Sequence, residues 1–316
     1  MKPARIVFPA FWFGKSSIQE AENLARRGVG GFCLYGGKAQ QMQDFIKRMQ
    51  DISPYGRLLF CADIADNLRE IVTDAPKLPT NLETSAFPTA QDVAYRKGYV
   101  TARMALAIGL NWVLAPVVDL GYNATTFGDE PLKVTQLAGD FTAGLSNGGA
   151  LNCIKYFPGV SGVLKTLAQL EDAEFLPYKH MFRRADAIMP SDMIFPNIDN
   201  DNQAMLSDKV IQGLLKKRLN YKGCVVSFPL FKGHLRYEEA SAIKMLHCKI
   251  ENILAPRHAE RIIDAVEREI DKGFLMDELI HAVSNHEMFL SKVMAGPEPL
   301  SIKEAFVLAE KDFKKK

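Results

Sequence analysis

The chain has 316 residues, of which 47% are apolar and 24% charged, and its formal net charge is +2. This is the composition of a globular protein with a large core, and so small a charge argues against nucleic acid as a partner. No apolar run reaches 18 residues, which argues against membrane insertion. The N-terminal residues lead directly into a strand pattern without a cleavable leader, so we expect a cytoplasmic protein.

Eight short apolar runs recur along the chain, each followed by a segment with helical periodicity. Because these runs are continuously apolar rather than alternating, they indicate parallel strands covered on both faces. The expected strands are residues 6–8, 31–35, 57–62, 112–117, 151–155, 187–189, 224–227 and 250–254. This order predicts an α/β fold, a single (β/α)8 TIM barrel, with a doubly wound open sheet as the alternative.

The helical segments between the strands carry start and stop signals, chiefly serine or proline at the beginning and glycine just past the end. Helices are therefore expected at residues 17–27, 131–147, 207–219 and 259–272. The connection 63–93, which is the longest, is expected to arch over one end of the barrel. We expect the barrel domain to span residues 1–295, and a C-terminal helix with a frayed basic tail to span residues 296–316.

The cysteine count is odd, no two cysteines form a CxxC pair, and four of the five lie inside strand-like runs. These features favour small, buried, reduced thiols over disulfides or a metal site. The cysteines are Cys33, Cys61, Cys153, Cys224 and Cys248. His281 and His286 lack the spacing of metal ligands and are expected at the surface. We therefore expect neither a metal nor another cofactor.

The functional groups of such a barrel come from the C-terminal ends of its strands. Polar side chains and aromatic rings both occur at these positions. The polar candidates are Asp63, Asp119, Lys155, Asp192 and His234, and the aromatic ones are Trp12, Phe13, Tyr35 and Tyr156.

Five motifs carry a family resemblance. They are GVGGFCLYGG at 28–37, APVVD at 115–119, TFGDEP at 126–131, KYFPG at 155–159 and GCVVSFPL at 223–230. In this order the chain resembles glycoside hydrolase family 3, most closely its branch of single-barrel β-N-acetylglucosaminidases that act on peptidoglycan fragments. The match covers nearly the whole chain, and KxFPG combined with APVxD is specific. The resemblance implies a TIM barrel and retaining hydrolysis of β-linked amino sugars.

The departures from the family pattern fall on the catalytic groups. Phe228 stands where the family has its nucleophilic aspartate, and a retaining glycosidase needs a carboxylate there. The loop 160–167 has neither the histidine nor the aspartate that act as acid and base in the family. Thr125 replaces the arginine that holds the sugar, and Tyr156 replaces a histidine.

The remaining groups leave two interpretations open. As a binding site, the resemblance implies that a sugar is held by polar groups and aromatic rings, namely Lys155, Tyr156, Asp63, Asp119, Trp12 and Tyr35. As structural groups, Lys155 pairs with Asp63 or Asp119 to neutralise buried charge, and the rings close the top of the barrel.

We therefore predict a non-catalytic relative of the family that serves as a binding or structural scaffold, acting through a protein partner or in an assembly. One alternative is an active glycoside hydrolase that uses relocated groups, for which the candidates are Asp63, Asp119, Asp192 and His234. The other alternative is a sensor that binds an amino sugar without cleaving it.

Overall fold

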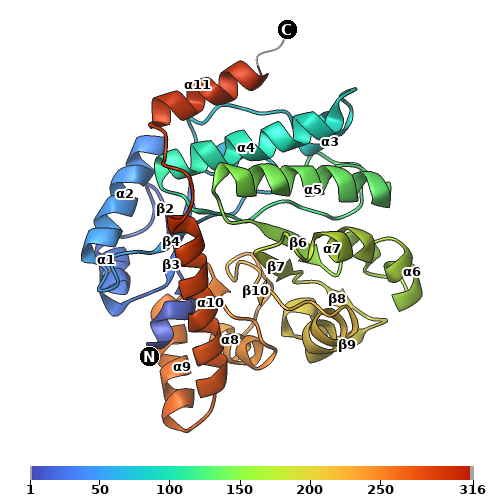
Figure 1. The fold of residues 1–316 in the computed structure, drawn as a ribbon. Coiled ribbons are helices and arrows are strands. Elements are labelled where there is room, and N and C mark those ends of the chain that lie inside the picture. Colours follow the sequence, from blue (N-terminus) through green and yellow to red (C-terminus); the bar gives the residue numbers. More distant parts are fainter. Residues whose placement is uncertain (1, 314–316) are drawn as a thin grey trace.

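The computed structural model describes residues 2–313, and eight parallel strands form its centre (Figure 1). The first barrel strand is divided at Pro9 into two short segments, and the other seven are continuous. The strands are β1 (Val7–Phe8) with β2 (Ala10–Trp12), β3 (Gly31–Tyr35), β4 (Leu59–Ala62), β5 (Trp112–Val113), β6 (Cys153–Phe157), β7 (Ala187–Pro190), β10 (Cys224–Val225) and β11 (Ile253–Leu254).

The sheet closes on itself. One ladder runs β2-β3-β4-β5 and another runs β6-β7-β10. A parallel bridge from Trp112 to Leu151 joins the two ladders, and a bridge from Val226 to Asn252 continues toward β11. Finally β11 pairs with β1 in parallel, with Ile253 opposite Val7. The prediction of a TIM barrel is confirmed, and this last pairing excludes the open doubly wound sheet.

Helices surround the barrel on its outside. They are α1 (Ile18–Arg27), α2 (Ala39–Ile52), α3 (Asn81–Ser85), α4 (Ala90–Ile108), α5 (Pro131–Gly148), α6 (Leu167–Asp172), α7 (Phe175–Met181), the π-helix η5 (Lys209–Arg218), α8 (Glu238–His247), α9 (Ala259–Asp271), α10 (Met276–Met294) and α11 (Ile302–Phe313). Four 3₁₀ turns complete the list: η1 (Pro3–Ile6), η2 (Leu68–Glu70), η3 (Val160–Gly162) and η4 (Ala204–Leu206).

The helix signals in the sequence correspond to real caps. The Ser17 hydroxyl accepts a hydrogen bond from the Glu20 N–H at the start of α1. Gly28 and Gly149 end α1 and α5 with φ angles of 92° and 96°, a left-handed conformation that favours glycine. The Ser207 hydroxyl accepts from the Val210 N–H at 3.1 Å, as expected for a serine cap.

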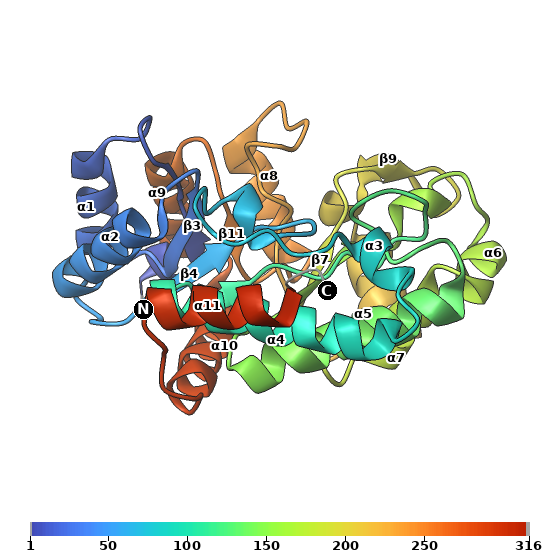
Figure 2. The same ribbon diagram turned by 90° about the horizontal axis from the view of Figure 1, so that it is seen from above.

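The C-terminal part of the chain adds a helix to the outside of the barrel. Figure 2 shows α11 alongside α4, which in turn packs against α5. Because α11 runs to Phe313, the first residues of the predicted frayed tail are helical, and residues 314–316 lie outside the described part of the chain. Within residues 2–313, no helix combines the length and apolar character needed to cross a bilayer.

Two features of the structure differ from the sequence-based expectation. An antiparallel hairpin, β8 (Ile194–Phe195) with β9 (Asp199–Gln203), follows β7, although the polar sequence of β9 gave no strand signal. His286, expected at the surface, is fully buried: α10 packs under the barrel and places the imidazole 5.7 Å from the Phe8 ring. The cysteine prediction is confirmed, since all five are buried and free.

Candidate functional site

Lys155 lies at the centre of the C-terminal end of the barrel, which we call the mouth. Its side chain is fully buried, and its Nζ donates to Asp63 Oδ1 at 2.9 Å and to the Ile64 carbonyl at 2.7 Å. Asp63 follows β4, and Lys155 lies within β6. The ion pair that the structural interpretation expects is therefore present, with Asp63 rather than Asp119 as the partner of Lys155.

A second lysine, absent from the sequence-based candidates, completes this cluster. Lys232, in the loop after β10, places its Nζ 2.6 Å from Asp63 Oδ2, and 41% of its side chain is exposed. Burial opposes ionisation of Asp63, but the two ammonium groups outweigh it and lower the pKa of this carboxyl to about 2. Burial opposes the charge of Lys155 too, yet Asp63 raises the pKa of this lysine.

Asp119 does not join the lysines but anchors the loop after β6. Its Oδ1 accepts a hydrogen bond from the Val160 N–H at 2.9 Å. Burial raises the pKa of Asp119 to about 7, even though backbone hydrogen bonds favour the charged form. Asp119 is therefore partly protonated near neutral pH while it holds the loop.

Glu174 anchors the same loop from α7's side. Its carboxylate is buried and accepts from Lys165 Nζ at 2.5 Å and from the Ser161 hydroxyl at 3.2 Å. Gly159 runs between the two acids with a φ angle of 118°, where a Cβ would come within 2.8 Å of Glu174 Cγ. The segment that lacks the family's acid and base is thus a short loop fixed at both ends.

The aromatic candidates form two separate groups. Trp12 stacks on Tyr35 with ring centroids 5.0 Å apart, and the Phe231 ring meets the edge of Trp12 at 4.7 Å. Tyr156 instead pairs with Phe228 at 5.6 Å, beside the lysine cluster.

The fourth aromatic candidate lies elsewhere: Phe13 packs against Phe11 and Phe45 and belongs to neither group. The rings of the mouth therefore contact one another within each of the two groups.

Asp192 and His234 come together at the rim. Asp192 Oδ2 lies 3.5 Å from His234 Nδ1, and these residues come from the loops after β7 and β10. The His234 side chain is 89% exposed, whereas that of Asp192 is 15% exposed. Both oxygens of Asp63 and one oxygen of Asp119 are bonded to other partners, and among the described residues no hydrogen bond or ion pair joins either residue to Asp192 or His234.

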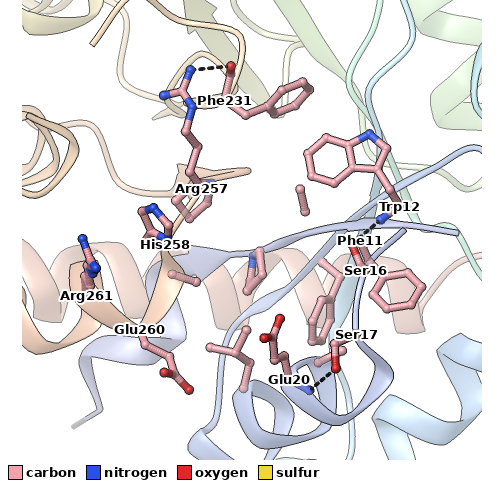
Figure 3. Close-up of a pocket in the computed structure, with 17 residues that line it drawn as sticks. Phe11, Trp12, Ser16, Ser17, Glu20, Phe231, Arg257, His258, Glu260 and Arg261 are labelled. Atoms are coloured by element: carbon pink, nitrogen blue, oxygen red, sulfur yellow. Dashed lines mark hydrogen bonds between the residues drawn. The ribbon is translucent and has the colours of Figure 1, made fainter. Parts of the chain in front are cut away.

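A cavity of about 480 Å³ lies beside the mouth, between the first strand and the N-terminal end of α9 (Figure 3). Trp12 and Phe231 line this cavity, so the rings that lie at the mouth also form part of the cavity wall. Arg257 crosses its upper side and donates to the Phe231 carbonyl at 2.7 Å. Asp63, Asp119 and Lys155 are not among the residues that line this cavity.

A family model for the glycosyl hydrolase family 3 N-terminal domain matches residues 4–286. The chain belongs to glycosyl hydrolase family 3. Among its relatives is the β-hexosaminidase of Photobacterium profundum, 28% identical over 230 residues that cover 67% of this chain and 69% of the relative. The β-hexosaminidase of Pseudomonas aeruginosa is 23% identical over 231 residues, with the same coverage.

Solved structures of the family share the fold. The β-N-acetylglucosaminidase of Thermotoga maritima superposes with a TM-score of 0.83 at 21% identity, covering 95% of this chain and 69% of that one. NagZ of Neisseria gonorrhoeae gives a TM-score of 0.79 at 19% identity, covering 99% and 98%. This chain therefore has the family barrel along nearly its whole length.

Lys232 is the residue of the mouth that the sequence did not reveal. It follows Phe228 by four positions, in a loop whose sequence indicates only Phe228 and His234 as candidate residues. Its role depends on reaching Asp63, 169 positions away in the chain, and a single exposed-looking lysine carries no signal of such a contact. Its position close after the SFPL motif is the one sequence feature that could have pointed to Lys232.

Proposed function

We propose that this chain is a non-catalytic member of glycosyl hydrolase family 3 that serves as a binding or structural scaffold. The observation that carries the proposal is the double pairing of Asp63, whose two oxygens are engaged by Lys155 and Lys232. Both oxygens of Asp63 are held by ammonium groups rather than presented to a sugar, and with a pKa of about 2 this carboxyl is ionised at neutral pH and has no proton to donate.

The other groups of the mouth support the same conclusion. Retaining hydrolysis needs two carboxyl groups about 5 Å apart, one to attack and one to transfer the proton. Phe228 occupies the nucleophile position that the family resemblance implies, and it packs against Tyr156. One oxygen of Asp119 accepts a hydrogen bond from the Val160 N–H, so this carboxyl is tied to the loop after β6.

The reaction proposed to be lost is hydrolysis of a β-linked amino sugar, as the names of the β-hexosaminidase relatives suggest. We propose that the chain acts instead through contact with a protein partner or within an assembly. A cytoplasmic location fits this proposal, because all five cysteines are free thiols.

One observation favours a second candidate, a residual glycoside hydrolase. Asp192 and His234, both predicted as replacement groups, lie 3.5 Å apart at the rim. A carboxylate that orients an imidazole is an arrangement for proton transfer. It would serve as acid and base only if a sugar bound over the rim rather than inside the mouth.

Hydrolysis of a chromogenic β-N-acetylglucosaminide, with a panel of other aryl glycosides, separates the two candidates. The proposal of a non-catalytic protein predicts no turnover above the buffer rate for the purified chain. The same result is expected for His234→Ala and Asp192→Asn. Turnover that both variants abolish would establish the second candidate. Because the His234 side chain is exposed, its replacement should leave the fold intact. A loss of turnover in His234→Ala would therefore reflect lost chemistry rather than unfolding.

A further inference from the structure

The ammonium group of Lys232 occupies a site with the features of a ligand pocket. It lies 2.6 Å from Asp63 Oδ2, 5.9 Å from the centre of the Tyr35 ring and 5.6 Å from that of the Phe231 ring. A carboxylate combined with aromatic faces is the arrangement that binds ammonium groups strongly, through charge and through the ring quadrupole.

The residues around this ammonium group are buried or hydrogen-bonded to the barrel, apart from Lys232 itself. Asp63 is 5% exposed and Tyr35 is 8% exposed, and the Tyr35 hydroxyl has no hydrogen-bond partner among the residues that the structure describes. The turn that carries Lys232 is fixed to β11, because the N–H groups of Leu230 and Phe231 donate to the carbonyls of Leu254 and Ala255. Only the long, partly exposed side chain of Lys232 is free to withdraw.

The two lysines differ in this respect. Lys155 is fully buried and also bonds the Ile64 carbonyl, so it is a permanent part of the barrel. Lys232 enters from the solvent side and makes its one side-chain hydrogen bond, among the described residues, to Asp63. The position of Lys232 Nζ is therefore the place where a molecule from solvent would meet Asp63.

We infer that Asp63, Tyr35 and Phe231 form a binding site for a primary ammonium group, which Lys232 fills as a tethered occupant. The mouth then admits an external primary amine only when Lys232 withdraws. The inference does not depend on whether the chain hydrolyses glycosides, since it concerns binding alone. A neutral hydroxyl or an acylated amine would bind less well, because neither forms a charge-assisted hydrogen bond to Asp63 Oδ2 or a cation–π contact with the two rings.

Removal of the occupant tests the inference. Lys232→Ala leaves Asp63 Oδ2 without its solvent-side partner and leaves space for a small ligand, whereas Lys232→Met removes the charge but keeps most of the volume. Thermal unfolding is measured in increasing ethylammonium chloride, with sodium chloride at equal ionic strength as the baseline. Ethanol and N-ethylacetamide serve as neutral probes of similar size.

The expected result is a saturable rise in melting temperature with ethylammonium for Lys232→Ala, but not for Lys232→Met or with either neutral probe. To reach the same rise in melting temperature, the wild-type chain should need at least about a tenfold higher ethylammonium concentration than Lys232→Ala, because its own Lys232 competes for the site. Equal behaviour of ethylammonium and sodium chloride in Lys232→Ala would overturn the inference, as would an equal response of Lys232→Met.

A second cavity-forming variant, Lys232→Ser, keeps the test decisive if the alanine variant is poorly folded. The readout is independent of turnover, so its failure would leave the proposed loss of catalysis untouched. Conversely, turnover on an aryl glycoside would refute the proposed function without deciding whether the amine site exists.

Discussion

Asp63 has two ammonium partners, and the consequences of removing each group differ. Loss of Lys232 leaves Asp63 paired with Lys155 inside the barrel. Loss of the Asp63 charge leaves Lys155, which is fully buried, with only the Ile64 carbonyl as a partner. An uncompensated buried charge is among the most destabilising defects a fold can contain.

Asp63→Asn should therefore lower the free energy of unfolding by about 3–5 kcal/mol, the usual cost of breaking a buried ion pair from one side. Urea denaturation at neutral pH measures it. The matched control is Asp192→Asn, which breaks the exposed contact with His234 and should cost less than about 1 kcal/mol. Similar losses for the two variants would show that the mouth pair is not buried in solution.

His286 makes stability depend on acid. Burial, and then the nearby charge of Arg5, lower the pKa of this imidazole from 6.5 to about 3. Between these values the unfolded chain binds a proton that the folded chain does not, so the free energy of unfolding falls as the pH drops from about 6.5 toward 3. Below about 3 this contribution levels off, because both states are protonated.

In His286→Phe this part of the pH dependence should disappear. The slope of unfolding free energy against pH between 4 and 6 should decrease by up to about 1.4 kcal/mol per pH unit relative to the wild-type chain. Urea denaturation across this range gives the slopes. The control is His180→Phe, a substitution at an exposed histidine in α7. An unchanged slope in His286→Phe would mean that the imidazole is accessible to protons in the folded state.

At the scale of elements, the loop after β6 is held in place by contacts from several sides. Asp119 and Glu174 hold it from two sides, and Asn197 in the turn between β8 and β9 donates to the carbonyls of Leu164 and Lys165. The close passage of Gly159 between the two acids leaves no room for a side chain. The loop is thus held by contacts on both sides.

Gly159→Ala should therefore loosen this loop. Its added Cβ would meet Glu174 Cγ at 2.8 Å, whereas a Cβ at Gly56, which also has a positive φ angle, would meet no atom within 4 Å. Both variants carry backbone strain, so only Gly159→Ala should add a clash. Hydrogen exchange of the amides in residues 160–165 should speed up in Gly159→Ala and stay unchanged in Gly56→Ala. Protection that remains intact in both would show that Glu174 moves aside without releasing the loop.

The elements that the sequence predicted well are those encoded locally. Continuous apolar runs marked the eight strands, and capping residues such as Ser17 and Gly28 marked helix ends. The hairpin β8–β9 was not predicted, because Asp199 and its neighbours are polar. Its fold depends on contacts such as the hydrogen bond that the Ser207 hydroxyl donates to Asp199 Oδ2 at 2.6 Å. His286 was misplaced, and Lys232 was missed, because partners distant in the chain decide where each one lies.

At the scale of the whole molecule, barrel closure explains why a changed mouth is tolerated. The strands and helices that bury most of the core lie around and below the mouth, so the fold does not require catalytic groups at its top. The chain spans the family barrel along nearly its whole length. Family membership therefore fixes the architecture, whereas the proposed loss of activity concerns the few side chains at Asp63, Lys155, Phe228 and Lys232.

The central claim is that no side chain of the mouth can form a bond to a sugar. Incubation with a fluorinated β-N-acetylglucosaminyl fluoride, which traps the glycosyl-enzyme of a retaining glycosidase, followed by intact mass measurement, tests this claim most directly. A trapped β-hexosaminidase serves as the positive control. The expected result is an unchanged mass for this chain. A stable increase by one fluoroglycosyl group, mapped to Asp63, Asp119 or Asp192, would contradict the account.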